Sequence, residues 1–155
     1  MEEIHKQTSL SADEISRYAR HISLSEIGIK GQEKLKNSSI ACIGTGGLGS
    51  PLLIYLAAAG IGRIGIVDFD VVEDSNLQRQ IIHTTNSIGA LKTNSAKEHL
   101  LKINPYCQID VFNQKLTNNN ALEILKTYDL ICDCSDNFPT RYLINDACFI
   151  LKKPN

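Results

Sequence analysis

The chain has 155 residues, a formal net charge of −1 and a hydrophobic fraction of 43%. That length suits one domain with a sizeable core, and the nearly balanced charge predicts neither a nucleic-acid nor a membrane partner. No apolar run reaches membrane-spanning length, and the polar start is not a secretory signal, so we expect a cytoplasmic protein, or a plastid stromal one if the gene is organellar.

The five cysteines favour reduced thiols over disulfides. Four of them lie in apolar segments, as is typical of a reducing compartment, and no C-x-x-C pair is present. Cys132 and Cys134 would point to one face of a strand. We interpret them as packing residues, with a metal or redox role as the alternative.

The first 36 residues are predicted to form a helical arm ahead of the main domain, residues 37–155. Residues 1–10 are expected to be frayed. Ser11 and Glu14 then have the spacing of a capping box, which predicts a helix from about residue 13. Arg17 and Arg20 would share one side of that helix. The spacing favours a solvated face, with Arg17 paired to an acidic residue one turn earlier, over contact with a phosphate. The glycines at 28 and 31 predict a turn, followed by a last helical turn over 32–36.

A strand, a glycine loop and a helix follow one another over residues 40–60. The apolar run 40–43 predicts a buried strand, residues 51–59 predict a helix, and Gly60 is a plausible C-cap. Between strand and helix, Gly44, Gly46 and Gly49 complete a G-x-G-x-x-G pattern. In this context the pattern predicts a phosphate held by the loop and by the helix start, rather than a purely structural turn.

The second strand is predicted over residues 64–67, and Asp68 stands at its end. A carboxylate about twenty residues past the first glycine is where a Rossmann-type domain contacts ribose hydroxyls. The alternative role for Asp68 is a helix or turn cap. In the polar stretch 75–80 that follows, Arg79 could equally be a phosphate ligand or an ordinary surface residue.

A helix is predicted to begin at about residue 89 and to end at about Asn104, ahead of a proline. Lys92 near its start is unfavourable beside the positive end of the helix dipole unless an anion is near. Residues 108–112 predict a third strand.

The last third of the chain predicts a helix over 121–127 with an Asn cap, a strand over 130–133 and a final helix over 138–151. Asp136, which follows the fourth strand, is either the cap of the final helix or a magnesium ligand. The whole pattern predicts an α/β fold, a Rossmann-like open parallel sheet with helices on both faces. Ligands bind at the carboxyl ends of such strands, where Gly47, Asp68 and Asp136 all fall.

These segments together resemble the MoeB/ThiF/HesA family, bacterial relatives of the ubiquitin-activating enzymes. The resemblance runs from about residue 11 to 155. It rests on RYAR at 17–20, GTGGLG at 44–49, DFD at 68–70, SNLQRQ at 75–80, Lys92 and DCSDN at 133–137.

The resemblance implies an adenylyltransferase that uses ATP and Mg²⁺ to activate the C-terminal glycine of a ubiquitin-like sulfur-carrier protein, of the MoaD or ThiS type, for molybdopterin or thiamine synthesis. The implied catalytic residues are Arg20, Arg79, Lys92 and Asp136. Arg20 would reach into the site of a second subunit of a homodimer, and Asp136 would bind the metal. The implied nucleotide-binding residues are Gly44, Gly46, Gly47, Gly49, Asp68, Asp70, Ser75, Asn76, Arg79, Lys92, Asp136 and Asn137.

Family members continue well beyond the point where this chain stops, so we expect a fragment or a natural truncation. Their zinc-binding Cys pairs are absent, and zinc is not expected here. Two alternatives stay open, since the glycine pattern is shared: an NAD(P)-dependent dehydrogenase domain, and a nucleotide-binding remnant without catalytic activity.

Overall fold

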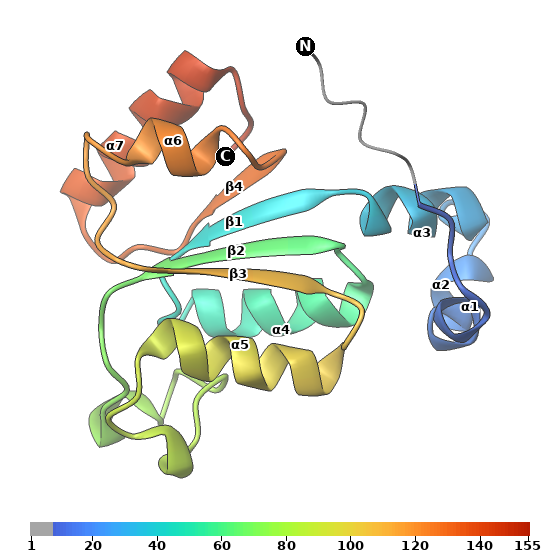
Figure 1. The fold of residues 1–155 in the computed structure, drawn as a ribbon, viewed down its shortest axis with the longest axis horizontal. Helices are drawn as coiled ribbons and strands as arrows, with labels where there is room; N and C mark the ends of the chain where they lie inside the picture. Colours follow the sequence, from blue (N-terminus) through green and yellow to red (C-terminus); the bar gives the residue numbers. More distant parts are fainter. Residues whose placement is uncertain (1–7) are drawn as a thin grey trace.

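The computed structural model describes residues 8–155 of the chain (Figure 1). Its elements follow the predicted alternation of strands and helices after a short helical start. They are α1 (Ala12–Arg17), α2 (Ala19–Ile22), α3 (Gly28–Lys36), β1 (Ser39–Ile43), α4 (Gly49–Ala59), β2 (Arg63–Asp68), the 3₁₀ turns η1 (Asp74–Asn76) and η2 (Thr85–Ser87), α5 (Lys92–Ile103), β3 (Gln108–Asn113), α6 (Ala121–Leu125), β4 (Leu130–Asp133) and α7 (Phe138–Leu151).

The four strands form one parallel sheet in the order β3-β2-β1-β4. Cys42 of β1 is in register with Ile66 of β2 on one side and with Cys132 of β4 on the other. The chain crosses from β1 outward to β2 and β3, then returns past β1 to β4. The carboxyl ends of β1 and β4, where this reversal occurs, form the switch point at which open parallel sheets bind ligands. The predicted fold class is confirmed.

Helices cover both faces of the sheet (Figure 1), and an apolar layer lies between the sheet and the helices on each face. One layer joins β1, β2 and β3 to α4 and α5 through residues such as Leu53 and Leu100, both fully buried. The other joins the sheet to α6 and α7 through Leu125 and Ile144. Burial on both faces explains why β1, β2 and β4 are apolar runs. The edge strand β3 instead has the alternating sequence QIDVFN. Cys132 and Cys134 pack against the first layer, in agreement with the packing interpretation.

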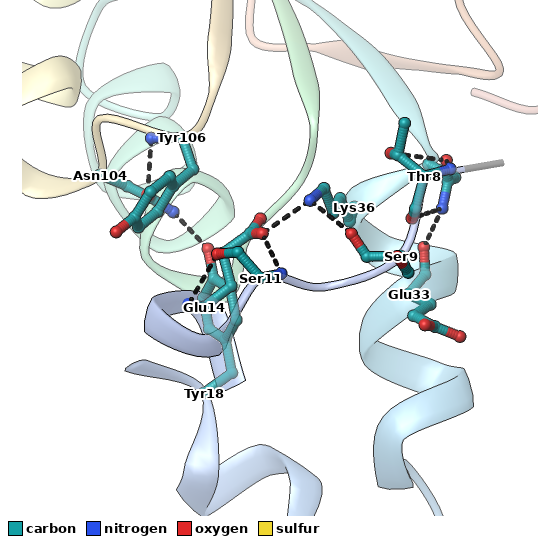
Figure 2. A network of polar contacts seen from close by, with 10 residues as sticks. Thr8, Ser9, Ser11, Glu14, Tyr18, Glu33, Lys36, Asn104 and Tyr106 are labelled. Atoms are coloured by element: carbon teal, nitrogen blue, oxygen red, sulfur yellow. Dashed lines mark hydrogen bonds and ion pairs between the residues drawn. The ribbon is translucent and has the colours of Figure 1, made fainter. Parts of the chain in front are cut away.

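The N-terminal helices are fastened to the domain by a polar network (Figure 2). The predicted capping box is present: the Ser11 backbone N–H donates to Glu14 Oε2 (2.8 Å) and the Glu14 N–H to Ser11 Oγ (3.2 Å). The same buried carboxylate accepts from Lys36 Nζ at 2.6 Å, and Lys36 also donates to the Ser9 carbonyl. Asn104 Nδ2 donates to the Tyr18 hydroxyl at 2.7 Å, which links the α1–α2 junction to the end of α5. Residues 8–10 are therefore held rather than frayed, and residues 1–7 of that prediction lie outside the described residues.

Several local expectations at the arm are wrong. The single helix predicted from about residue 13, which would carry both Arg17 and Arg20, is two short helices broken at Tyr18. Arg17 is not paired with Asp13 or Glu14; its Nη1 donates to the Ile103 carbonyl at 2.9 Å, and its guanidinium lies over the Tyr106 ring. The 28–31 segment is the first turn of α3 rather than a separate turn, because a glycine at 28 can adopt the positive φ of 59° that starts this helix after Ile27.

The side-chain cap that an Asn was predicted to provide for the helix at 121 is absent. Asn120 is at the N-cap position of α6, but its Oδ1 accepts from the Thr117 N–H at 2.8 Å and so closes the preceding turn.

At the other end of the described chain, the Ile131 N–H donates to the Pro154 carbonyl at 3.1 Å, so the last residues run along the outer edge of β4. None of the helices between residues 8 and 155 is both long enough and apolar enough to cross a bilayer.

Candidate functional site

A cavity of about 490 Å³ opens at the carboxyl ends of the strands. Its lining comes from the loops after β1, β2, β3 and β4 and from the starts of α5 and α7. The volume is that of an ordinary small-molecule site. Of the residues singled out from the sequence, it brings together Gly44, Gly46, Gly47, Asp68, Asp70, Arg79, Lys92, Asp136 and Asn137.

The glycines of the loop divide into two kinds. A Cβ at Gly49 would lie 2.0 Å from the Gly44 carbonyl oxygen, and one at Gly44, whose φ is 99°, would lie 2.8 Å from the Cys134 carbonyl oxygen. These two are glycines because the fold leaves no alternative. A Cβ at Gly46 or Gly47 would meet nothing closer than 3.8 and 3.6 Å. Their missing side chains leave space in the cavity instead, which is what a backbone that must approach a phosphate needs.

Asp68 holds the glycine loop with both carboxylate oxygens. Its Oδ2 accepts from the Thr45 N–H (2.8 Å) and from Thr45 Oγ1 (2.7 Å), and its Oδ1 accepts from the Asp70 N–H (3.0 Å). The turn-capping alternative is therefore observed. Asp68 also lines the cavity, and contact with a ribose stays a prediction.

The cation at the start of α5 has an anion beside it. Lys92 Nζ lies 3.0 Å from Asp70 Oδ2, and the Lys92 side chain is 8% exposed. This pair accounts for a lysine at the positive end of a helix dipole. The Asp70 side chain is half exposed, so a ligand anion entering the cavity could compete with it for the same ammonium.

The polar stretch after β2 places only part of its residues at the cavity. Arg79 lines it, with Nη1 donating to the Ser75 carbonyl at 3.3 Å and its carbon stem next to Gly47. Asn76 is buried and accepts from the Glu73 N–H, while Ser75 Oγ donates to the Glu73 carboxylate. Neither Ser75 nor Asn76 lines the cavity, so their side chains shape the turn that presents Arg79.

Asp136 is not the cap of the final helix. Asn137 is the N-cap of α7, and its Oδ1 accepts from the Thr140 N–H at 3.0 Å. Asp136 is left exposed at the cavity, with only a 3.3 Å contact from Asn137 Nδ2 on Oδ1. No cluster of three or more His, Cys, Asp or Glu with metal-binding geometry occurs among residues 8–155. A lone carboxylate still suits Mg²⁺, which takes most of its ligands from water and from the phosphates of a nucleotide.

Arg20 is the one implied catalytic residue that the fold keeps away from the cavity. It lies on α2, exposed, and is absent from the lining.

Sequence reasoning gave no individual role to six lining residues with polar side chains, which are Gln80, Gln114, Lys115, Ser135, Thr140 and Arg141. Two of them have contacts that bear on the site. Arg141 donates from Nε and Nη2 to the Ser135 carbonyl, at 3.3 and 3.0 Å, and so clamps the loop that carries Asp136. Its spacing of four residues from the Asn137 cap is one helical turn, a signal that could have found it. Gln80 is 4% exposed, and its Oε1 has no partner among the described residues. It belongs to the SNLQRQ stretch on which the resemblance rests.

Comparisons with known proteins agree on one family. A family model described as "ThiF family" matches residues 18–155. A probable molybdopterin-synthase adenylyltransferase of Porphyra purpurea is 54% identical over 148 residues, which are 96% of this chain and 39% of the relative. The adenylyltransferase and sulfurtransferase MOCS3 of Drosophila yakuba is 51% identical over 147 residues, 95% of this chain and 32% of the relative. The chain thus spans less than half the length of these relatives.

Solved structures give the same picture. Escherichia coli tRNA N6-threonylcarbamoyladenosine dehydratase, TcdA, in complex with ATP has a TM-score of 0.89 and 27% identity, covering 95% of this chain and 60% of that one. Escherichia coli MccB with MccA-N7isoASN has a TM-score of 0.78 and 28% identity, covering 88% and 42%.

Proposed function

This chain belongs to the ThiF family, and from that premise we propose that it forms the ATP site of an adenylyltransferase. The reaction joins AMP to the C-terminal glycine carboxylate of a ubiquitin-like sulfur-carrier protein and releases pyrophosphate. The observation that carries the proposal is the set of residues that line the cavity. Gly46 and Gly47 leave room for a phosphate, and Arg79, Lys92 and Asp136 line the same cavity.

The relatives support the choice of reaction. Those at 54% and 51% identity are named as adenylyltransferases, and one of them specifically for molybdopterin synthase. A structural neighbour was solved with ATP. We therefore place this chain in the molybdopterin branch, with a MoaD-type carrier as the partner, and treat a thiamine-type carrier as an outcome of the test.

The residue types suit nucleotidyl transfer. A carboxylate is already an anion and a nucleophile at neutral pH, so the first step needs no general base. The barrier comes from bringing that anion to a polyphosphate, and positioned cations lower it by neutralising charge. Lys92 and Arg79 are those cations, and the Asp70 carboxylate keeps Lys92 oriented until the nucleotide binds. Asp68 keeps the glycine loop in shape through its hydrogen bonds with Thr45. In this proposal its carboxylate, which lines the cavity, also accepts from the ribose hydroxyls.

Asp136 would hold Mg²⁺, which supplies further charge neutralisation at the phosphates when it is bound. Its exposure and its single long contact with Asn137 leave oxygens available for a cation. Arg141 fixes the backbone beside it through Ser135. Asn137 keeps that loop next to the helix start.

Arg20 does not line the cavity of its own chain. In this proposal it therefore completes the site of a second subunit. A mixture of Arg20→Ala and Lys92→Ala chains tests this. In a homodimer with crossed sites, one site in the mixed dimer keeps both native residues, so activity returns to a fraction of the wild-type value. No recovery on mixing argues against the crossed site.

The direct test of the proposed function is mass spectrometry of carrier proteins incubated with this chain, ATP and Mg²⁺. A carrier that gains the mass of AMP demonstrates adenylation, and comparing MoaD-type with ThiS-type carriers decides the branch. Calorimetry with ATP and with NAD⁺ separates the alternatives. ATP binding without an adduct supports a nucleotide-binding remnant, and preferential NAD⁺ binding supports a dehydrogenase domain. The two cations and Asp136 at the cavity favour the triphosphate.

A further inference from the structure

Four basic residues line the cavity, and Arg79 and Lys92, the two cations of the proposed phosphate site, come from different parts of the chain. Arg79 lies in the segment of residues 76–83, and Lys92 lies in the first turn of α5. Residues 84–91 form the connection between them, with exposed side chains at most positions. The distance between the two cations therefore depends on how the 76–83 segment is attached to α5.

His83 makes the polar attachment. Its Nδ1 lies 2.9 Å from Ser95 Oγ, and both side chains are buried. Within the described part of the chain, this is the only side-chain hydrogen bond that joins the 76–83 segment to α5. Ser95 follows Lys92 by three residues, which puts both on the same side of the helix. Ile82, fully buried against the α4–α5 layer, anchors the segment but fixes no direction.

The ring of His83 also faces the glycine loop. Its Nε2 is buried and has no hydrogen-bond partner of ordinary geometry among residues 8–155. The Thr45 backbone, next to Gly46, is near enough to act on the ring and raises its pKa. Histidine accepts at one ring nitrogen and donates at the other when neutral. The Ser95 contact occupies Nδ1 in either tautomer, because a hydroxyl can donate or accept.

Burial lowers the pKa of His83, partly offset by the Thr45 backbone and by Asp68, with Lys92 and His99 acting in the lowering direction. This lowering of the pKa favours the neutral imidazole. That state suits a positioning role next to the glycine loop, because no additional charge is introduced beside Lys92.

We propose that His83 is a positioning residue for the phosphate site: its hydrogen bond to Ser95 sets the spacing of Arg79 and Lys92, and its ring supports the glycine loop from behind. The inference rests on the proposed function, since it assigns His83 to the binding of the nucleotide's phosphates. A positioning role differs from a general role in packing. It predicts that substitutions at His83 or Ser95 weaken the binding of the phosphates and leave the binding of adenosine nearly unchanged.

Three variants of the full 155-residue chain test the proposal, with dissociation constants for ATP and adenosine measured by competition against a fluorescent ATP analogue. Ser95→Ala and His83→Gln both remove the hydrogen bond at Nδ1. Each should raise the Kd for ATP about tenfold, the equivalent of one hydrogen bond, and should change the Kd for adenosine less than about twofold. His83→Asn places an amide at the position of Nδ1 and should recover most of the ATP affinity.

His21→Gln is the matched control, because His21 Nδ1 makes a similar 3.0 Å contact with Gln32, far from the cavity lining. This variant should lower the melting temperature and leave both dissociation constants unchanged. Equal losses of ATP and adenosine affinity in Ser95→Ala would make His83 a packing residue and overturn the inference. So would unchanged ATP affinity in both Ser95→Ala and His83→Gln. A wild-type chain that does not bind ATP refutes the proposed function itself.

Discussion

A methyl group at Gly47 should separate folding from nucleotide binding. The added Cβ would lie 3.6 Å from the nearest heavy atom, Arg79 Cδ, an ordinary contact distance, and Gly47 is not among the glycines with positive φ. Gly→Ala at such a position stabilises a protein by about 0.4–1 kcal/mol, because the unfolded chain has less freedom to lose. The melting temperature should therefore stay level or rise by about 2–4 °C.

The same methyl group occupies the space through which a phosphate would approach the loop. We expect Gly47→Ala to weaken ATP binding at least about tenfold, or about 1.4 kcal/mol. The assay is a thermal melt together with calorimetric titration of ATP. Gly49→Ala is the matched control: its Cβ would lie 2.0 Å from the Gly44 carbonyl oxygen, so it should lose about 3 kcal/mol or more of stability. Unchanged ATP affinity in a well-folded Gly47→Ala chain would refute the assignment of the loop to phosphate binding.

Three further outcomes are expected. Asp136→Asn should keep the wild-type melting temperature, because the side chain is exposed, and should abolish magnesium-dependent AMP transfer in the carrier assay; an active variant would remove the metal role. Burial alone would raise the pKa of Glu14, but hydrogen bonds with Lys36 and with the capping residue lower it below 4.5, so its stabilisation is present above about pH 4.5 and lost as the pH falls through the folded-state pKa. Glu14→Gln should accordingly flatten the acid side of the stability profile in urea titrations between pH 6 and 3.5, and an unchanged slope would contradict this. Tyr128→Phe should cost about 1–2 kcal/mol, because the buried hydroxyl donates to Asp110 at 2.9 Å; equal urea midpoints would show that water replaces this bond.

The sequence by itself determined the elements whose signals lie within one or two turns of chain. Each of these signals acts on near neighbours and so has the same meaning in any fold. They are the capping box at Ser11, the apolar runs at β1, β2 and β4, the alternating pattern at β3, the glycine that ends α4 and the proline tolerated at the start of α7. The glycine spacing and the carboxylate after the second strand also predicted the parallel sheet and the edge of it that binds ligands.

The tertiary structure alone decided which partners several polar residues contact. Asp68 binds the loop that begins with Gly44, the Lys92 ammonium meets Asp70, and Arg17 reaches a carbonyl 86 residues away. The distinction between Gly47, which leaves space, and Gly49, which has none, likewise depends on atoms brought together by the crossing of the chain. Such pairings are set by the order of the strands and by the packing of helices on the sheet. Residues far apart in the sequence become neighbours only when the core has formed, and the sequence pattern around each of them carries no record of its eventual partner.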